Sequence, residues 1–298
     1  MRGMRKLLLL CCWGLTLTAS AQSATVQVIT KRINKDFSYK DGYEVNIDGD
    51  RAEVYIETWD QPIIRMQIDL VAKHPSRQTA ERDLEYLNYL AQRVKNKIYL
   101  RNYLSVPEGQ PQPQSQLKAI YTLKVPAECP VYLKTNYGLA DIENLRNRLR
   151  INSRFSQIGM QNIKGWIDIN TFFGDVTGDW LDGNVAITSR RSDLTLNNIS
   201  GHFDINAQYG ILKLFANAGL LDLNLQADHS QVFFNSASFN KFQYNLVANQ
   251  SKLQLPSGLK LQVNETAPGI KKVTFRPNAE FYPNVTISVS FGELILGK

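Results

Sequence analysis

The sequence predicts an all-β protein whose central part is a right-handed parallel β-solenoid of about 18 residues per coil, preceded by a mixed strand region that carries one helix. Three observations predict this fold. From residue 129 to about residue 236 a small residue returns every 18 residues, glycines return in a second phase, and apolar residues recur at fixed offsets. Such repetition without helix formers is typical of a solenoid, because each coil can bury its apolar face only against its neighbours.

The small residues mark the turns of the predicted coils. The first series comprises Gly138, Ser156, Gly174, Ser192 and Gly210, and aromatic residues precede four of its members (Tyr137, Phe155, Phe173 and Tyr209). The second series comprises Gly165, Gly183, Gly201 and Gly219. We expect the glycines of both series to have structural roles in turns.

Apolar residues occupy four offsets counted from the second series. Two positions on, the residues are Leu149, Ile167, Val185, Phe203 and Leu221; four positions on, they are Ile151, Ile169, Ile187, Ile205 and Leu223. Eleven positions on, they are Ile158, Val176, Leu194 and Leu212; thirteen positions on, they are Met160, Gly178, Leu196 and Leu214. Identical positions stack about 4.8 Å apart in a parallel solenoid, so these residues should form inward apolar ladders. A polar series, Asn152, Asn170, Thr188, Asn206 and Asn224, should form a hydrogen-bonded stack inside a turn.

Residues 1–21 have the pattern of a cleaved signal peptide. Three basic residues precede a short apolar run at 7–17, and residues 19–21 (Ala-Ser-Ala) form a small-x-small cleavage site. A lipoprotein would need Cys11 or Cys12 after a small residue at the end of that run, and both stand early in it. No later stretch approaches the roughly 20 apolar residues of a membrane span. We therefore expect an exported protein.

Residues 22–128 do not follow the 18-residue rule and are predicted to be an N-terminal capping region. Alternating stretches such as 64–70 predict half-buried strands. Residues 77–95 change to helical spacing, with Ser76 as the N-cap and an apolar face of Leu84, Leu87, Leu90, Ala91 and Val94. This segment is the one predicted helix.

After residue 236 the register of the repeats slips. Leu259, Leu261 and Val263 predict one irregular coil, which ends the solenoid region at 129–263. Residues 264–298 are then predicted to be C-terminal capping strands, and the aromatic-glycine turn at Phe291-Gly292 would close the stack. Both ends of an open solenoid need caps, because they expose unpaired strand edges.

Charge and cysteine content exclude several classes of protein. Cleavage of the leader removes three of the 34 Lys and Arg residues and none of the 27 Asp and Glu, so the formal charge falls from +7 to +4. No basic run marks a nucleic-acid footprint. Cys129 alone remains after cleavage, which excludes an intramolecular disulfide and suits a buried small residue. We expect no cofactor and no metal, because His74, His202 and His229 are scattered and match no catalytic or zinc motif.

One acidic column is predicted on an outer strand surface. Asp168, Asp204 and Asp222 share one offset between two inward positions, with Ala186 interrupting them. Such carboxylates could bind calcium or act as acid and base in polysaccharide cleavage. The alternative is a solvated edge that keeps the sheet soluble, which we favour.

Trp166 and Trp180 stand near turns and outside the inward columns. Exposed aromatic side chains on a flat sheet can stack sugar rings or anchor a partner. Alternatively both residues pack beneath a cap or the loop at 107–115. Together with the acidic column they are the candidate ligand-binding residues.

Several segments resemble a known family. The segments are Val54-Tyr-Ile-Glu-Thr-Trp-Asp60, Leu123-Lys-Val-Pro126, Leu133-Lys-Thr-Asn-Tyr-Gly-Leu-Ala-Asp-Ile142, Phe172-Phe-Gly-Asp-Val176 and Phe291-Gly-Glu-Leu294. They resemble the bacterial "putative adhesin" or adhesin-like β-solenoid domains of unknown function. The resemblance covers most of residues 37–298 and supplies no catalytic residues. It implies an exported protein of a Bacteroidetes-type envelope, in the Gram-negative periplasm or on the cell surface.

These observations favour a non-enzymatic envelope protein that presents a flat solenoid face to a protein or glycan partner. Two alternatives stay open: an enzyme acting on polysaccharide, and a structural scaffold or signalling accessory that meets only other envelope proteins. The sequence does not predict the oligomeric state.

Overall fold

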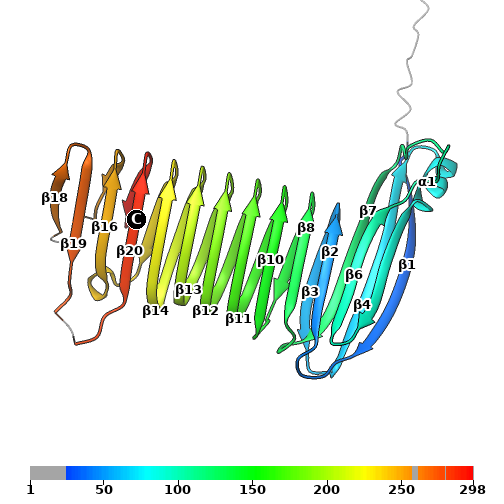
Figure 1. Ribbon diagram of the computed structural model, residues 1–298, viewed down its shortest axis with the longest axis horizontal. Coiled ribbons are helices and arrows are strands. Elements are labelled where there is room, and N and C mark those ends of the chain that lie inside the picture. The colour runs from blue at the N-terminus through cyan, green and yellow to red at the C-terminus, as the bar shows by residue number, and fades with distance from the viewer. Residues whose placement is uncertain (1–24, 257–260, 279, 298) are drawn as a thin grey trace, which may run out of the picture.

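The computed structural model describes residues 25–256, 261–278 and 280–297. In this part of the chain the structure is elongated and mostly β, with one α-helix, and its strands form one large, mixed, mostly parallel sheet (Figure 1). Helix α1 lies at one end of the long axis and the β18–β19 hairpin lies at the other. The prediction of a mostly β chain with one helix is confirmed.

The elements follow one another in three groups. The N-terminal group is β1 (Gln27–Ser38), β2 (Glu44–Asp50), β3 (Ala52–Trp59), β4 (Ile63–His74), α1 (Arg77–Leu84), β5 (Leu87–Val94), β6 (Lys97–Leu104) and β7 (Gln116–Pro126). The central group is β8 (Val131–Asn136), β9 (Leu139–Glu143), β10 (Arg148–Arg154), β11 (Gln157–Phe172), β12 (Asp175–Arg190), β13 (Asp193–Gln208), β14 (Ile211–Asp228) and β15 (Gln231–Ser236). The C-terminal group is η1 (Phe239–Lys241), β16 (Gln243–Asn249), β17 (Lys252–Gln254), β18 (Gln262–Ala267), β19 (Ile270–Phe275), β20 (Asn284–Ser290) and β21 (Glu293–Leu296).

The central strands are parallel, in the register that the sequence period predicts. Ile167 of β11 pairs with Val185 of β12, 18 positions on, and Val185 pairs with Phe203 of β13. Each long strand bends between its two halves, so the stack has two broad sides. We call face A the outer surface of β8, β10, the second halves of β11–β14 (166–172, 184–190, 202–208 and 222–228) and β20. Face B is the outer surface of β9, the first halves of β11–β14, β15 and β21.

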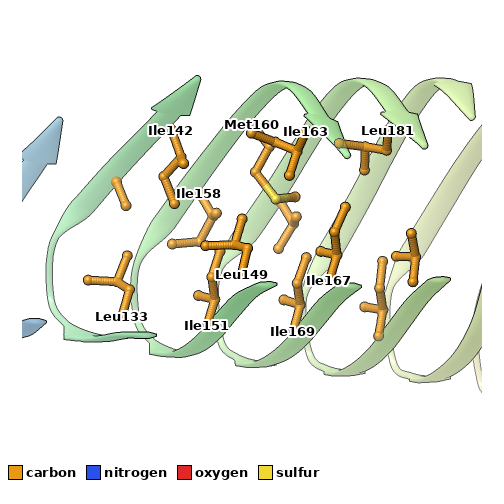
Figure 2. Close-up of a cluster of buried hydrophobic side chains, with 14 of the residues drawn as sticks. Leu133, Ile142, Leu149, Ile151, Ile158, Met160, Ile163, Ile167, Ile169 and Leu181 are labelled. Atoms are coloured by element: carbon orange, nitrogen blue, oxygen red, sulfur yellow. The ribbon is translucent and has the colours of Figure 1, made fainter. Parts of the chain in front are cut away.

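The predicted apolar ladders form the core between the two faces. Side chains of successive repeats point inward at the same level, as Ile151 and Ile169 do in Figure 2. Both are about 1% exposed or less. A further buried column of Ile163, Leu181 and Ile199, which the four predicted offsets do not include, lies on the short side between the faces. Burying one such side chain fully contributes about 1.5–3 kcal/mol relative to leaving it in water.

The aromatic residues before the first turn series form a stack of their own. Tyr137, Phe155 and Phe173 lie ring on ring, with centroids 4.9 and 5.0 Å apart, and the Arg191 guanidinium lies 5.1 Å from the Phe173 ring. All four have φ between +51° and +54°. This left-handed conformation costs about 1–2 kcal/mol for a residue with a side chain. Stacking along the edge of the molecule offsets that cost.

Glycine and serine alternate in the turn that follows these aromatic residues. A Cβ at Gly174 would overlap the backbone carbonyl of Ser156 in the preceding repeat. The Gly174 N–H donates to the Ser192 hydroxyl at 3.1 Å, and that hydroxyl donates to the Arg190 carbonyl. Gly138 and Gly210 are placed in the same way. The alternation therefore reflects close approach of successive turns.

The register changes inside β14, and the register predicted there is wrong. Gly201 pairs with Leu220, and from the pair His202 and Asp222 onward the two strands are offset by 20 residues. Leu221, predicted to be inward, is 55% exposed. The repeated leucines of β14 fit either register, so a sequence period cannot locate the two extra residues.

Two further corrections follow from this shift. Gly219 does not continue the column of Gly165, Gly183 and Gly201, each of which has a positive φ. Asp222 is level with His202, and Asn224 takes the place beside Asp204. The predicted acidic column therefore ends at Asp204.

The predicted asparagine stack lies elsewhere. Asn170 and Asn206 are exposed in the middle of face A strands and not inside a turn. An asparagine pair does form at the corner after the first half-strands, where Asn162 Nδ2 donates to Asn144 Oδ1 at 2.7 Å. These two residues have φ of +52° and +62°, a conformation that asparagine tolerates better than most residues.

The predicted helix over 77–95 is only half helical. Ser76 caps α1 as predicted, accepting from the Thr79 N–H at 3.4 Å, but α1 ends at Leu84. Residues 87–94 form β5, which pairs antiparallel with β6 along its whole length through a tight turn at Lys95. Helix propensity differs by only tenths of a kcal/mol per residue, so strand pairing decides the conformation.

The N-terminal region joins the stack directly. β2 pairs in parallel with β8, and β3 with β9, although residues 44–59 do not follow the sequence period. β6 and β5 extend one side, and β7, β4 and β1 extend the other, with antiparallel pairing between β4 and both β7 and β1. Charged residues of the outermost strand, including Lys31 and Arg32, discourage pairing with another sheet.

The C-terminal segment was expected to close the stack, and the structure places it inside. β20 lies between β14 and β16, and β21 lies between β15 and β17, all in parallel. The end of the stack is formed instead by the antiparallel strands β19 and β18, the latter containing Val263. Leu259 lies outside the described residues. The division of the chain at 128 and 263 stays a prediction.

The predicted leader at 1–21 also lies outside the described residues. Within residues 25–297, in the ranges that the structure describes, we find no helix long and apolar enough to cross a membrane.

Candidate functional site on face A

Parallel strands present their outward residues on face A in straight rows. One row runs across the stack as Arg148, Trp166, Asn184, His202 and Asp222. The next row, two residues further along each strand, is Arg150, Asp168, Ala186, Asp204 and Asn224. The rows are held by main-chain pairing, so the side chains project from a rigid surface.

A shallow groove of about 490 Å³ lies along these two rows. Ala186 and Asn184 are short, and the taller side chains of Trp166 and His202 stand on either side of them. Trp166 is 60% exposed. The groove therefore combines an aromatic side chain with carboxylate, amide and imidazole groups.

The carboxylates of the groove have different partners. Asp168 Oδ2 lies 3.1 Å from Arg150 Nε, in an exposed ion pair of the kind that contributes at most about 1 kcal/mol. Asp204 Oδ1 accepts from Asn224 Nδ2 at 3.3 Å. Asp222 is half-buried beside His202 in the register. Asp204 and Asp222 thus keep acceptor capacity that a ligand could use.

The structure brings together four of the five predicted ligand-binding residues. Trp166, Asp168, Asp204 and Asp222 line the groove, whereas Trp180 lies at another corner of the stack. Sequence reasoning missed His202. It directly follows Gly201, as Trp166 follows Gly165, so the repeat offset could have found it.

Trp180 occupies the corner where neighbouring repeats have Asn162 and Asn198. Its φ is +57°, which is uncommon for a bulky residue, and its side chain is 54% exposed. Asn198 Nδ2 donates to Asp179 Oδ1 at 2.8 Å beside it. Both tryptophans are more than half exposed, so the alternative that they pack beneath a cap or the loop at 107–115 is wrong.

The described residues offer no group of three or more His, Cys, Asp and Glu side chains that could hold a metal ion. Cys129 is fully buried, and burial raises the pKa of its thiol to about 12. The thiol is therefore protonated at neutral pH and a poor nucleophile. Cys129 is thus a small buried residue, as predicted.

No protein-family model matches this sequence, and no curated protein matches it. Crystal structures resemble it at low identity. A "putative adhesin" from Bacteroides fragilis NCTC 9343 is 12% identical, with a TM-score of 0.46 over 90% of this chain and 97% of that chain. A "putative adhesin" from Parabacteroides distasonis ATCC 8503 is 11% identical, with a TM-score of 0.44 over 90% and 97%.

A "putative lipid binding protein" from Parabacteroides distasonis ATCC 8503 is 9% identical, with a TM-score of 0.34 over 90% of this chain and 97% of that chain. The predicted resemblance to adhesin-like proteins is confirmed in that structures so described match most of the chain. At these scores the likeness carries no argument about what this chain binds.

Proposed function

We propose that this chain is an exported, non-enzymatic protein of the bacterial cell envelope that presents face A to a protein or glycan partner. The observation that carries the proposal is the groove in which Trp166, 60% exposed, stands beside Asp168, Asp204 and His202 on a rigid sheet. Aromatic side chains contribute large contact area, and pre-ordered polar groups bind without a large ordering cost. The parallel 18-residue register supports our reading of the chain as a right-handed β-solenoid.

The proposed location follows from the sequence. The leader pattern at 1–21 supports export, and the family resemblance supports the periplasm or surface of a Gram-negative bacterium.

A polysaccharide-active enzyme has less support. Asp168 and Asp204 stand two strands apart across Ala186, about 10 Å between their backbones, which is near the separation that inverting glycosidases use. Asp168, however, is ion-paired with Arg150 at 3.1 Å, and Asp204 is hydrogen-bonded to Asn224, so both carboxylates already have partners within the chain. Polysaccharide cleavage that is lost in Asp204→Ala would support the enzyme.

The first test is a glycan array probed with residues 22–298, with and without calcium. We expect a reproducible signal that Trp166→Ala weakens about tenfold or more, because about 1.4 kcal/mol of lost stacking is a factor of ten. The matched control is Trp180→Ala, which removes an exposed tryptophan outside the groove and should leave the signal unchanged.

An unchanged signal in Trp166→Ala would exclude the groove as the glycan site. An array without any signal would exclude a glycan as the partner of face A. Cross-linking of the protein in envelope extract then tests the protein arm, and a scaffold would be captured with envelope proteins whether or not Trp166 is present.

A further inference from the structure

Two strands of face A, one on either side of β12, present side chains of opposite charge. The outward residues of β10 include Arg148 and Arg154, and those of β14 include Asp222 and Asp228. β10 and β14 each lie two strands from β12.

These charges are also level with one another. The register places Arg148 in the same row as Asp222, and a second row runs from Arg154 through Phe172, Arg190 and Gln208 to Asp228. Each arginine therefore has an aspartate at its own height, four strands away. Four spacings are about 19 Å, so the two cannot pair within one molecule.

The arginines are available to an outside partner. Among the described residues, Arg148, Arg154 and Asp222 form no ion pair, while Asp228 lies 3.1 Å from the imidazole of its neighbour His229. Arg148 and Arg154 are exposed.

We propose that face A is self-complementary and joins two copies of this chain about a twofold axis that runs parallel to the strands and lies between the copies, above β12. This rotation places β10 of one copy over β14 of the other at equal height. Arg148 then faces Asp222 of the second copy, and Arg154 faces Asp228 of the second copy. Symmetry repeats both contacts, as in any isologous interface.

Charge also selects this orientation over the other face-to-face one. A twofold axis perpendicular to the strands would place β10 over β10 and bring Arg148 against Arg154 of the second copy. Like charges in such a contact oppose association.

The parallel axis also brings unfavourable contacts: Asp168 against Asp204 of the second copy, twice, and Arg190 against Arg190 of the second copy. Arg150 beside Asp168 offsets the first. Each Arg190 guanidinium lies 5.8 Å from the Phe172 ring of its own β11, on opposite sides of the axis.

The size and shape of the surface fit a dimer. The seven strands from β8 to β20 span about 34 Å by 23 Å, or about 780 Å² per copy and about 1,560 Å² in total, which is the size of a standard interface. The outward residues of the middle strand are the short Asn184, Ala186 and Thr188, followed by Arg190 at its end, so the two sheets can approach most closely along the first three. Trp166 comes opposite His202 of the second copy.

The inference rests on the proposed function, in that it takes face A as the binding face and names a second copy as its protein partner. It is tested by sedimentation of residues 22–298 and of two charge reversals, Arg148→Glu and Asp222→Arg. The wild type should be a dimer. Each variant alone should dissociate at least tenfold more readily, because each places two like-charged pairs in the interface.

An equimolar mixture of the two variants should dimerise again. In the mixed dimer the introduced glutamate of one chain meets the introduced arginine of the other, and the second contact between Arg148 and Asp222 is unchanged. A merely destabilised protein would not recover on mixing. The matched control is Lys213→Glu, an exposed change on face B in β14, which should dimerise as the wild type does.

A monomeric wild type, dimeric single variants or a mixture that stays monomeric would each overturn the inference. The glycan array distinguishes a failure of the self-association inference from a failure of the proposed function. A monomer that gives a Trp166-dependent array signal refutes self-association alone, whereas a dimer with a blank array refutes the glycan arm alone.

Discussion

At the scale of single residues, left-handed backbone positions decide much of this structure. At Tyr137, Phe155 and Phe173, ring stacking offsets the cost of the left-handed backbone. At Asn144 and Asn162 the same backbone conformation is occupied by asparagine, which tolerates it. Trp180 does neither: it is bulky, exposed and at φ +57°.

Trp180→Asn should therefore stabilise the protein by about 1 kcal/mol, because asparagine tolerates the left-handed conformation and can extend the row of Asn144 and Asn162. The guanidinium midpoint of unfolding measures this. Trp180→Ala is the control, since alanine keeps the conformational cost and should show no gain. A lower midpoint in Trp180→Asn would mean that the indole contributes packing that exposure does not indicate.

At the scale of elements, one buried carboxylate attaches α1 to the segment before β7. Asp83 Oδ2 accepts from the backbone N–H groups of Gln114 and Ser115 and from the Ser115 hydroxyl, each at 2.8 Å, and Arg82 lies 2.7 Å from Oδ1. Burial alone would raise the pKa of Asp83, but these hydrogen bonds hold it below its ordinary value of 3.8.

Since the folded-state pKa is lowered, the stabilisation is present above pH 3.8 and is lost as the pH falls through the lower folded value. Asp83→Asn should reduce the free energy of unfolding by about 2–3 kcal/mol at pH 7 and flatten its decline below pH 3.8. Urea unfolding between about pH 3 and 7 measures both. Glu81→Gln, an exposed change on the same helix, should shift stability by less than about 0.5 kcal/mol. An equal effect of the two substitutions would contradict this account.

At the scale of the whole molecule, the C-terminal strands connect two parts of the stack. Among the described strands, the main-chain pairing that links β16 and β17 to the central repeats runs through β20 and β21. The end of the stack should therefore depend on a segment that is synthesised after it.

Ile287→Asp places a charge in the buried column of β20 and should release β16–β19 from protection in hydrogen exchange, while β11–β13 stay protected. Val273→Asp in β19 is the matched control, because it should release the end strands and leave β20 paired with β14. Persistent protection of β16–β19 in Ile287→Asp would show that they dock independently.

The sequence alone predicts the repeat, its turns and most of the core, because a parallel stack needs the same residue type at the same offset in every coil. Ile151, Ile169 and Ile187 are buried where the period places them. The same offsets predict that Trp166 and Asp168 project from one surface.

Only the tertiary structure decided the features that depend on which strands meet. The period continues in the sequence past Gly201, but pairing inserts two residues in β14 and moves Asp222 beside His202. Residues 87–94 have helical spacing and become a strand because β6 lies beside them. The place of β20 inside the stack, and the opposed charges on either side of β12, arise from contacts between segments distant in sequence, which a local pattern does not encode.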